Sequence, residues 1–109
     1  MDAFDEFPLA EVGESELQKY VVANVESEDG RNKKVVRSRN VNHHNQIFDS
    51  LTTVAPGKVT CLGGGALFYS ANPKVIRVYG TSGEYGQDPD RNVTIALIAS
   101  AYPDFKVCT

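Results

Sequence analysis

Residues 61–86, CLGGGALFYSANPKVIRVYGTSGEYG, decide the fold of this chain. Residues 58–70 are predicted to form one strand kinked by three consecutive glycines, and Asn72-Pro73 turns it into a partner strand at 75–79. Glycine bends on either side of this hairpin can gather free backbone N–H groups into a concavity that binds anions. A strand bulge or close backbone packing explains the same glycines, and the residues alone leave both interpretations open.

The preceding segment predicts a β-hairpin and one helix. Residues 20–25 and 33–38 are rich in β-branched side chains and flank a polar turn, which is typical of paired strands. Beyond Asn42, apolar side chains follow helical spacing as far as Pro56-Gly57. The sequence therefore predicts an amphipathic helix of about three turns.

The last helix has the strongest start signal. Asp88 is predicted to cap it, with Pro89 at the first helical position, and Pro103 requires it to end near Tyr102. Its length is predicted as about 12 to 14 residues. Its buried face is predicted from a spacing of three and four: Val93, Ala96, Leu97, Ser100 and Ala101.

A final strand at residues 105–108 completes a β-β-α-β-β-α-β pattern. This pattern predicts an α/β (α+β) fold, in which two helices pack on a mixed sheet of about five to six strands. The 109 residues suit one domain, so we expect residues 1–16 to form an acidic N-terminal arm and residues 17–109 the single domain.

Charge and cysteine content narrow the classes of function. A net charge of −3 and a pI near 5.3 argue against nucleic-acid or acidic-membrane binding. No stretch approaches the roughly 20 apolar residues that span a bilayer, so we expect a cytoplasmic protein, and a monomer. Cys61 and Cys108 have neither a zinc spacing nor a disulfide framework, which favours free thiols.

The candidate chemistry centres on Asn42-His43-His44, which holds both histidines of the chain. A histidine at a helix start can carry a proton near neutral pH, although such a residue is also often a surface group. Adjacent side chains diverge, so a metal site at His43 and His44 is not expected. Lys19 and Arg37, at the ends of the predicted hairpin, are either solvated cations or partners of a bound dianion.

Five motifs in register resemble the small phosphohistidine phosphatase family, which includes the janus and ocnus proteins. They are Lys19-Tyr20-Val21, His44-x-x-Ile47-Phe48-Asp49, Cys61-Leu62-Gly63-Gly64-Gly65, Val78-Tyr79-Gly80-x-Ser82-x-x-Tyr85-Gly86 and Tyr102-Pro103-Asp104. The match covers roughly residues 8 to 107. The resemblance implies a metal-free and cofactor-free hydrolase that removes phosphate from histidine side chains of proteins.

The resemblance also implies roles for particular residues. His44 matches the catalytic histidine, as general base or phosphoryl acceptor, and Lys19 matches a substrate-binding lysine. Arg37 matches a basic residue of the second strand. Ser82, with the backbone of Gly83 and Glu84, matches the loop that holds a phosphate or sulfate anion.

Two departures from the family pattern support a second hypothesis. Ala66 stands where family phosphatases often carry an arginine, and Glu84 adds a carboxylate beside the anion loop. A carboxylate there opposes a dianion. The alternative is a non-catalytic regulatory protein of janus type, which binds phosphorylated partners through the retained anion nest.

The thiols yield the first prediction. Cys61→Ser should keep most of the turnover of phosphohistidine or phosphoramidate, because the resemblance assigns this region to a glycine turn and not to a thiolate nucleophile. A loss above about tenfold, roughly 1.4 kcal/mol in the barrier, with the fold intact by circular dichroism would overturn that assignment.

Overall fold

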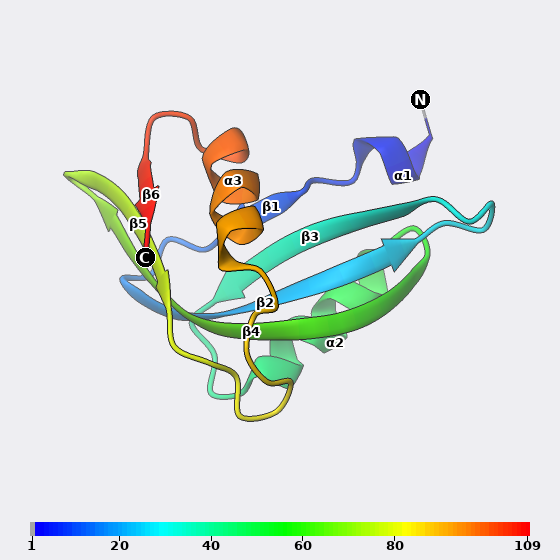
Figure 1. Cartoon of the computed structure of the whole chain (residues 1–109), viewed down its shortest axis with the longest axis horizontal. Coiled ribbons are helices and arrows are strands. Elements are labelled where there is room, and N and C mark those ends of the chain that lie inside the picture. Colours follow the sequence, from blue (N-terminus) through cyan, green and yellow to red (C-terminus); the bar gives the residue numbers. More distant parts are fainter. Residues whose placement is uncertain (1) are drawn as a thin grey trace.

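A six-stranded mixed sheet forms the body of the molecule, in the order β1-β3-β2-β4-β5-β6 (Figure 1). The computed structural model describes residues 2–109. Its strands are β1 (Ala10–Val12), β2 (Leu17–Glu26), β3 (Asn32–Arg39), β4 (Lys58–Ala71), β5 (Lys74–Tyr79) and β6 (Lys106–Cys108). Its helices are α1 (Ala3–Glu6), α2 (His44–Val54) and α3 (Arg91–Ala101). The predicted mixed α+β fold is confirmed.

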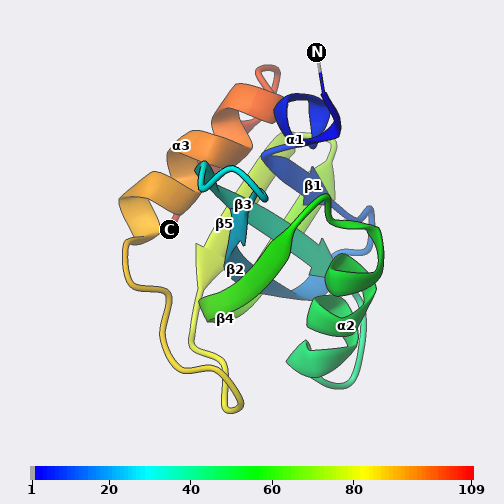
Figure 2. The ribbon, with the colours of Figure 1, turned by 90° about the vertical axis from the view of Figure 1, so that its right-hand side faces the viewer.

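The two longer helices lie on opposite sides of the sheet (Figure 2). Neighbouring strands β3, β2, β4 and β5 pair antiparallel, whereas β1 and β6 add parallel edges. Ile98 of α3 packs on one face, with a core of Ala10, Tyr20, Val22, Val36, Leu67, Ile76 and Val78. Leu51 of α2 packs on the other, with Phe4, Ala23, Val25 and Val35. Because successive side chains of β2 point to opposite faces of the sheet, β2 contributes residues to both cores.

Three glycines in the middle of β4 allow another backbone to lie directly on the strand. A Cβ atom at Gly63 would overlap the Gln87 carbonyl, one at Gly64 the Tyr20 carbonyl, and one at Gly65 the Tyr79 carbonyl. The Gly64 N–H also donates to the Gly86 carbonyl at 3.1 Å. Of the two interpretations of this run, the structure therefore supports close backbone packing at Gly63–Gly65, accompanied by a register shift opposite Val22/Ala23.

The predicted start of α3 is wrong by two residues. The N-cap is Asp90, whose carboxylate accepts from the Val93 N–H, and α3 is 11 residues long. Asp88 is instead buried, where it accepts from the Tyr20 hydroxyl at 3.0 Å and from the Thr94 hydroxyl. Burial, with the charge of Asp88, raises the pKa of Tyr20 to about 12. The Asp88 side chain, which the sequence predicted as the N-cap of α3, instead forms long-range hydrogen bonds in the core.

The predicted buried face of α3 is correct only at Leu97, which is partly buried against the first core. The side chains that α3 buries are Thr94 and Ile98, whereas Val93, Ala96, Ser100 and Ala101 are exposed. Because the helix begins later than predicted and Thr94 is drawn to Asp88, the core-facing stripe is rotated by about one residue, roughly 100°.

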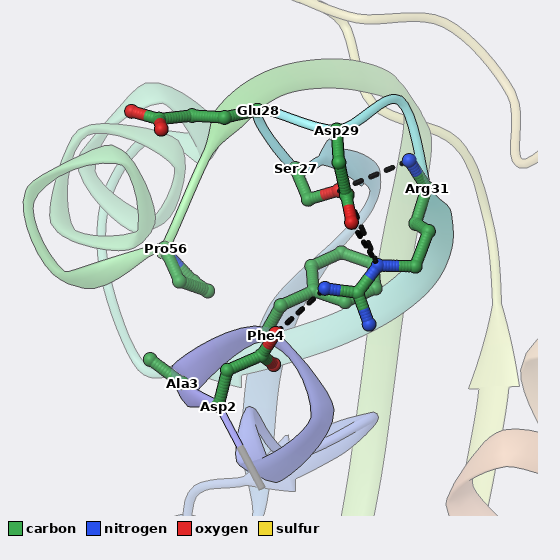
Figure 3. A pocket seen from close by; sticks show the side chains of 8 residues that line it. All are labelled: Asp2, Ala3, Phe4, Ser27, Glu28, Asp29, Arg31 and Pro56. Atoms are coloured by element: carbon green, nitrogen blue, oxygen red, sulfur yellow. Dashed lines mark hydrogen bonds and ion pairs between the residues drawn. The ribbon is translucent and has the colours of Figure 1, made fainter.

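Most of the acidic N-terminal stretch is bound to the sheet. Arg31, in the β2–β3 turn, lies over the Phe4 ring of α1 and contacts Asp2 at 2.6 Å and Asp29 at 3.0 Å (Figure 3). This contact raises the pKa of Arg31 and lowers the pKa of Asp2, where a backbone hydrogen bond from Asp5 has the larger effect. Strand β1 then pairs with β3. Met1, the first residue of the predicted arm, lies outside the described residues.

Gly64 and Gly83 form a matched pair for testing the packing at β4. Gly64→Ala should lower the free energy of unfolding by about 1–3 kcal/mol, since its methyl group meets the Tyr20 backbone. Gly83→Ala should change it by less than about 0.5 kcal/mol, because nothing lies within 4 Å of a Cβ there. Urea unfolding of both variants measures this difference, and equal stabilities would contradict the packing described.

Candidate functional site

His44 lies where α2 meets the glycines of β4. It is the first residue of α2, and its side chain is only 5% exposed. The ring Nε2 lies 2.9 Å from the Gly65 carbonyl oxygen. A carbonyl oxygen only accepts, so Nε2 carries the hydrogen and, in the neutral ring, Nδ1 keeps its lone pair. Within residues 2–109 no hydrogen-bond partner is recorded for Nδ1. That nitrogen is available to take a proton or a phosphoryl group.

The loop after β5 is held in shape by Ser82. This side chain is buried, and its hydroxyl accepts from the N–H groups of Glu84 and Tyr85 at 3.2 and 3.0 Å. The Ser82 N–H donates to the Gly86 carbonyl. Two of the three N–H groups expected to hold an anion, those of Ser82 and Glu84, therefore have acceptors inside the loop. Among the described residues none is recorded for the third, on Gly83.

Glu84 brings this loop to the start of α2. Its carboxylate accepts from the Asn45 N–H at 3.2 Å, directly after His44. The ring of Tyr85 packs against Phe48 of α2, with centroids 5.5 Å apart. The first N–H groups of a helix attract negative charge, so the Glu84 carboxylate occupies a position that also suits a phosphate oxygen. The structure thus brings His44 and the Ser82–Glu84 loop together.

Lys19 reaches the same side of the sheet from β2. It is half-buried and lies opposite Ala66, which follows the Gly65 acceptor of His44. Its other neighbour across the sheet is Arg39 on β3, which is exposed. No acceptor within residues 2–109 is recorded for either cation. Two like charges directly opposite each other repel, and an anion between them relieves that repulsion.

Arg37 lies on the same face of the sheet as Lys19, but it contacts the N-terminal segment. Its Nη2 donates to the Pro8 carbonyl at 2.7 Å, and its Nε contacts the Glu11 carboxylate at 3.2 Å. The guanidinium also covers the Phe7 ring. Burial lowers the pKa of Arg37, and the charge of Glu11 opposes this effect. Its donors hold the N-terminal segment, so the structure does not bring Arg37 to His44.

Arg39 was missed by the sequence interpretation. The signal was available, because residues two apart on a strand share a face and Arg39 is two residues beyond Arg37. What the sequence did not show is that only the outer of these two arginines remains free of protein acceptors in the described part of the chain.

Cys61 lies on β4 behind the site. Both cysteines are free thiols, as predicted. The Cys61 sulfur lies 3.7 Å from the carbonyl oxygens of Val22 and Gly63, and burial raises the pKa of this thiol. A raised pKa disfavours the thiolate needed for attack.

Two further findings concern residues 2–109. No three side chains of His, Cys, Asp or Glu lie close enough together there to hold a metal ion. Nor does that part of the chain contain a helix whose length and apolar content suffice to cross a membrane.

The amino-acid sequence is similar to those of known proteins. A model of the Janus/Ocnus family matches residues 4–106. The sex-regulated protein janus-A of Drosophila orena is 30% identical over 106 residues, covering 94% of this chain and 78% of the relative. Sex-regulated protein janus-B of Drosophila melanogaster is 35% identical over 77 residues, covering 67% of this chain and 55% of the relative.

Removing the Glu84 carboxylate should strengthen anion binding at this loop. Glu84→Ala frees the Asn45 N–H and deletes a like charge, so sulfate or phosphate should bind about threefold more tightly, measured by calorimetry and amide chemical shifts. Glu28→Ala, in the exposed β2–β3 turn, makes the same change in net charge and should have no such effect. Equal affinities for both variants would contradict the role given to Glu84.

Proposed function

This chain belongs to the Janus/Ocnus family, and we propose that it is a metal-independent protein-histidine phosphatase, which hydrolyses the P–N bond of phosphohistidine in proteins. The names of its relatives describe no activity, so the proposal depends on the site. The observation that carries it is the His44 ring, oriented by the Gly65 carbonyl so that Nδ1 is the basic nitrogen, with the Lys19 cation on the neighbouring strand.

Hydrolysis of phosphohistidine requires little covalent chemistry from the protein. The P–N bond of phosphohistidine is weak, and its leaving imidazole departs readily once it is protonated. The protein must hold the phosphoryl oxygens, align the attacking group and move one proton. Lys19 and the Gly83 N–H can hold the anion, while His44 handles the proton or the phosphoryl group.

Two routes fit a basic Nδ1. In the first, His44 takes a proton from water while the water oxygen bonds to phosphorus. The P–N bond breaks, and the substrate ring, protonated on its other nitrogen, leaves as neutral imidazole. In the second, Nδ1 itself bonds to phosphorus while the P–N bond of the substrate breaks, and the substrate ring, protonated on its other nitrogen, leaves as neutral imidazole. Water then cleaves the phosphoryl-enzyme and releases phosphate. The Gly65 carbonyl favours either route, because its hydrogen bond stabilises the positive charge that the ring acquires. Rapid quench with ³²P-labelled substrate distinguishes them.

The non-catalytic alternative also has an observation in its favour. The Ser82 and Glu84 N–H groups are occupied inside the loop, the Glu84 carboxylate caps the start of α2, and Ala66 supplies no charge. Such a loop suits weak recognition of a phosphorylated partner without turnover. Binding of a phosphohistidine peptide with no release of phosphate would favour this function.

The substrates we propose are phosphohistidine-containing proteins. We expect the protein to act as a monomer in the cytoplasm, a reducing compartment that suits its two free thiols.

Removing His44 or Lys19 should leave different kinetic signatures. His44→Ala should lower kcat at least about a hundredfold with phosphoramidate, because the proton or phosphoryl acceptor is gone. Lys19→Ala should lower kcat/KM about tenfold and leave measurable kcat, an effect that high salt partly mimics in the wild type.

Two matched variants serve as controls. His43→Ala removes the adjacent histidine at the N-cap, and Lys58→Ala removes an exposed lysine at the far end of β4. Both should turn over phosphoramidate at the wild-type rate. If His44→Ala behaves like His43→Ala, the active site has been misplaced and the proposed phosphatase activity fails with it.

A further inference from the structure

Helix α2 covers only part of its side of the sheet. Its buried Leu51 packs in the second core, Ile47 and Leu51 line a small hollow with Arg37 and Arg39, and α3 lies on the opposite side of the sheet. The β4–β5 hairpin and the start of β2 lie to the left of α2 (Figure 1). We call this surface the open sheet face and define it by six residues that the register places on one side: Leu17, Lys19, Arg39, Phe68, Arg77 and Tyr79.

The open sheet face has an apolar hollow. Phe68, Arg77 and Tyr79 line a shallow depression of about 340 Å³, large enough for one apolar or aromatic side chain. Tyr79 is 43% exposed, and Leu17, next to Phe68 across the strands, is 60% exposed. Single exposed apolar residues are ordinary, but a continuous strip around a hollow is typical of a binding surface.

The charge of this face is opposite to that of the chain. The protein has a net charge of −3, yet the open sheet face has three cations, Lys19, Arg39 and Arg77. No position of β2, β3, β4 or β5 that the register places on this side is an aspartate or glutamate. No side-chain carboxylate within residues 2–109 forms an ion pair with any of the three, and the one protein acceptor of Arg77 there is the Thr109 backbone oxygen, at 3.4 Å. Such a local positive potential attracts an acidic partner.

The hollow and the candidate active site share one row of the sheet. Tyr79 lies opposite Ala66, Ala66 lies opposite Lys19, and Ala66 follows the Gly65 acceptor of His44. With a rise of about 3.3 Å per residue, Phe68 lies roughly 10 Å along β4 from Gly65, the length of about three extended residues. A peptide bound at His44 therefore reaches the hollow with the residues that flank its modified histidine.

We propose that the open sheet face docks the protein substrate through an acidic segment with one apolar side chain, within about four residues of the phosphohistidine. This inference rests on the proposed phosphatase function and names its substrate class. The apolar side chain enters the hollow at Phe68, and the flanking carboxylates meet Arg77 and Arg39. Lys19 remains for the phosphoryl group.

Other occupants fit the face less well. A second copy of this chain would bring two sets of three cations together, which is repulsive. A nucleic acid would meet cations here, but the chain as a whole is acidic and the hollow between the cations has apolar walls.

The test compares three substrates: phosphoramidate, a phosphohistidine peptide with acidic flanks and one phenylalanine, and the same peptide with lysine flanks. Wild type should prefer the acidic peptide about tenfold in kcat/KM, and less at 0.5 M salt. Arg77→Glu should abolish this preference and leave phosphoramidate turnover within about twofold of wild type. Lys58→Glu, outside the open sheet face, makes the same charge change and should keep the preference.

The outcomes separate the two proposals. No turnover of any substrate would overturn the phosphatase function. Equal turnover of both peptides, or equal effects of Arg77→Glu and Lys58→Glu, would overturn docking at the open sheet face alone. Titration with the unphosphorylated acidic peptide tests docking without catalysis, and shifts should concentrate at Phe68, Arg77 and Tyr79. Tighter binding of a mixed-sequence RNA oligonucleotide at 0.15 M salt would also overturn the choice of partner.

Discussion

At Gly63–Gly65, the backbone of β4 lies in direct contact with the backbones of three other segments, and this close packing shapes the site. Side chains at these positions would overlap carbonyl groups of β2, β5 and the loop before α3. With no side chains in the way, residues 80–87 lie against β4, and the His44 ring reaches the Gly65 carbonyl. The glycines thus act on the site through packing: they let α2, β4 and the Ser82 loop meet at one point.

Of the cations on the α2 side of the sheet, some hold the N-terminal segment in place and others remain available to a ligand. Arg37 and Arg31 hold the N-terminal segment, through Pro8 and Glu11 in one case and acidic side chains in the other. Lys19 and Arg39, opposite each other, have no such partner recorded in the described part of the chain. Arginine suits the structural role because its planar fork serves several acceptors at once. The cations that remain to bind a ligand on this side of the sheet are therefore those that do not pair with the N-terminal segment.

The sequence predicted most of the fold, because strand alternation and helical spacing are local patterns. All five predicted strands and both longer helices are present, and His44 does begin α2. The start of α3 was missed because Asp88 is drawn into a buried network with Tyr20 and Thr94. The partners of Arg37 were equally hidden, since they come from a distant segment of the chain, in which Pro8 is 29 residues away. Both features depend on contacts between residues far apart in the chain, and local sequence patterns do not predict such contacts.

The tautomer of the His44 ring decides whether Nδ1 is the basic nitrogen of this site. Long-range ¹H–¹⁵N correlation spectra of the folded protein, recorded where the ring is neutral, report which ring nitrogen carries the hydrogen. We expect a protonated Nε2, whose N–H donates to the Gly65 carbonyl, and an unprotonated Nδ1 whose ¹⁵N shift moves when phosphate is added. A ring protonated at Nδ1, with an Nε2 that does not respond to phosphate, would contradict this expectation.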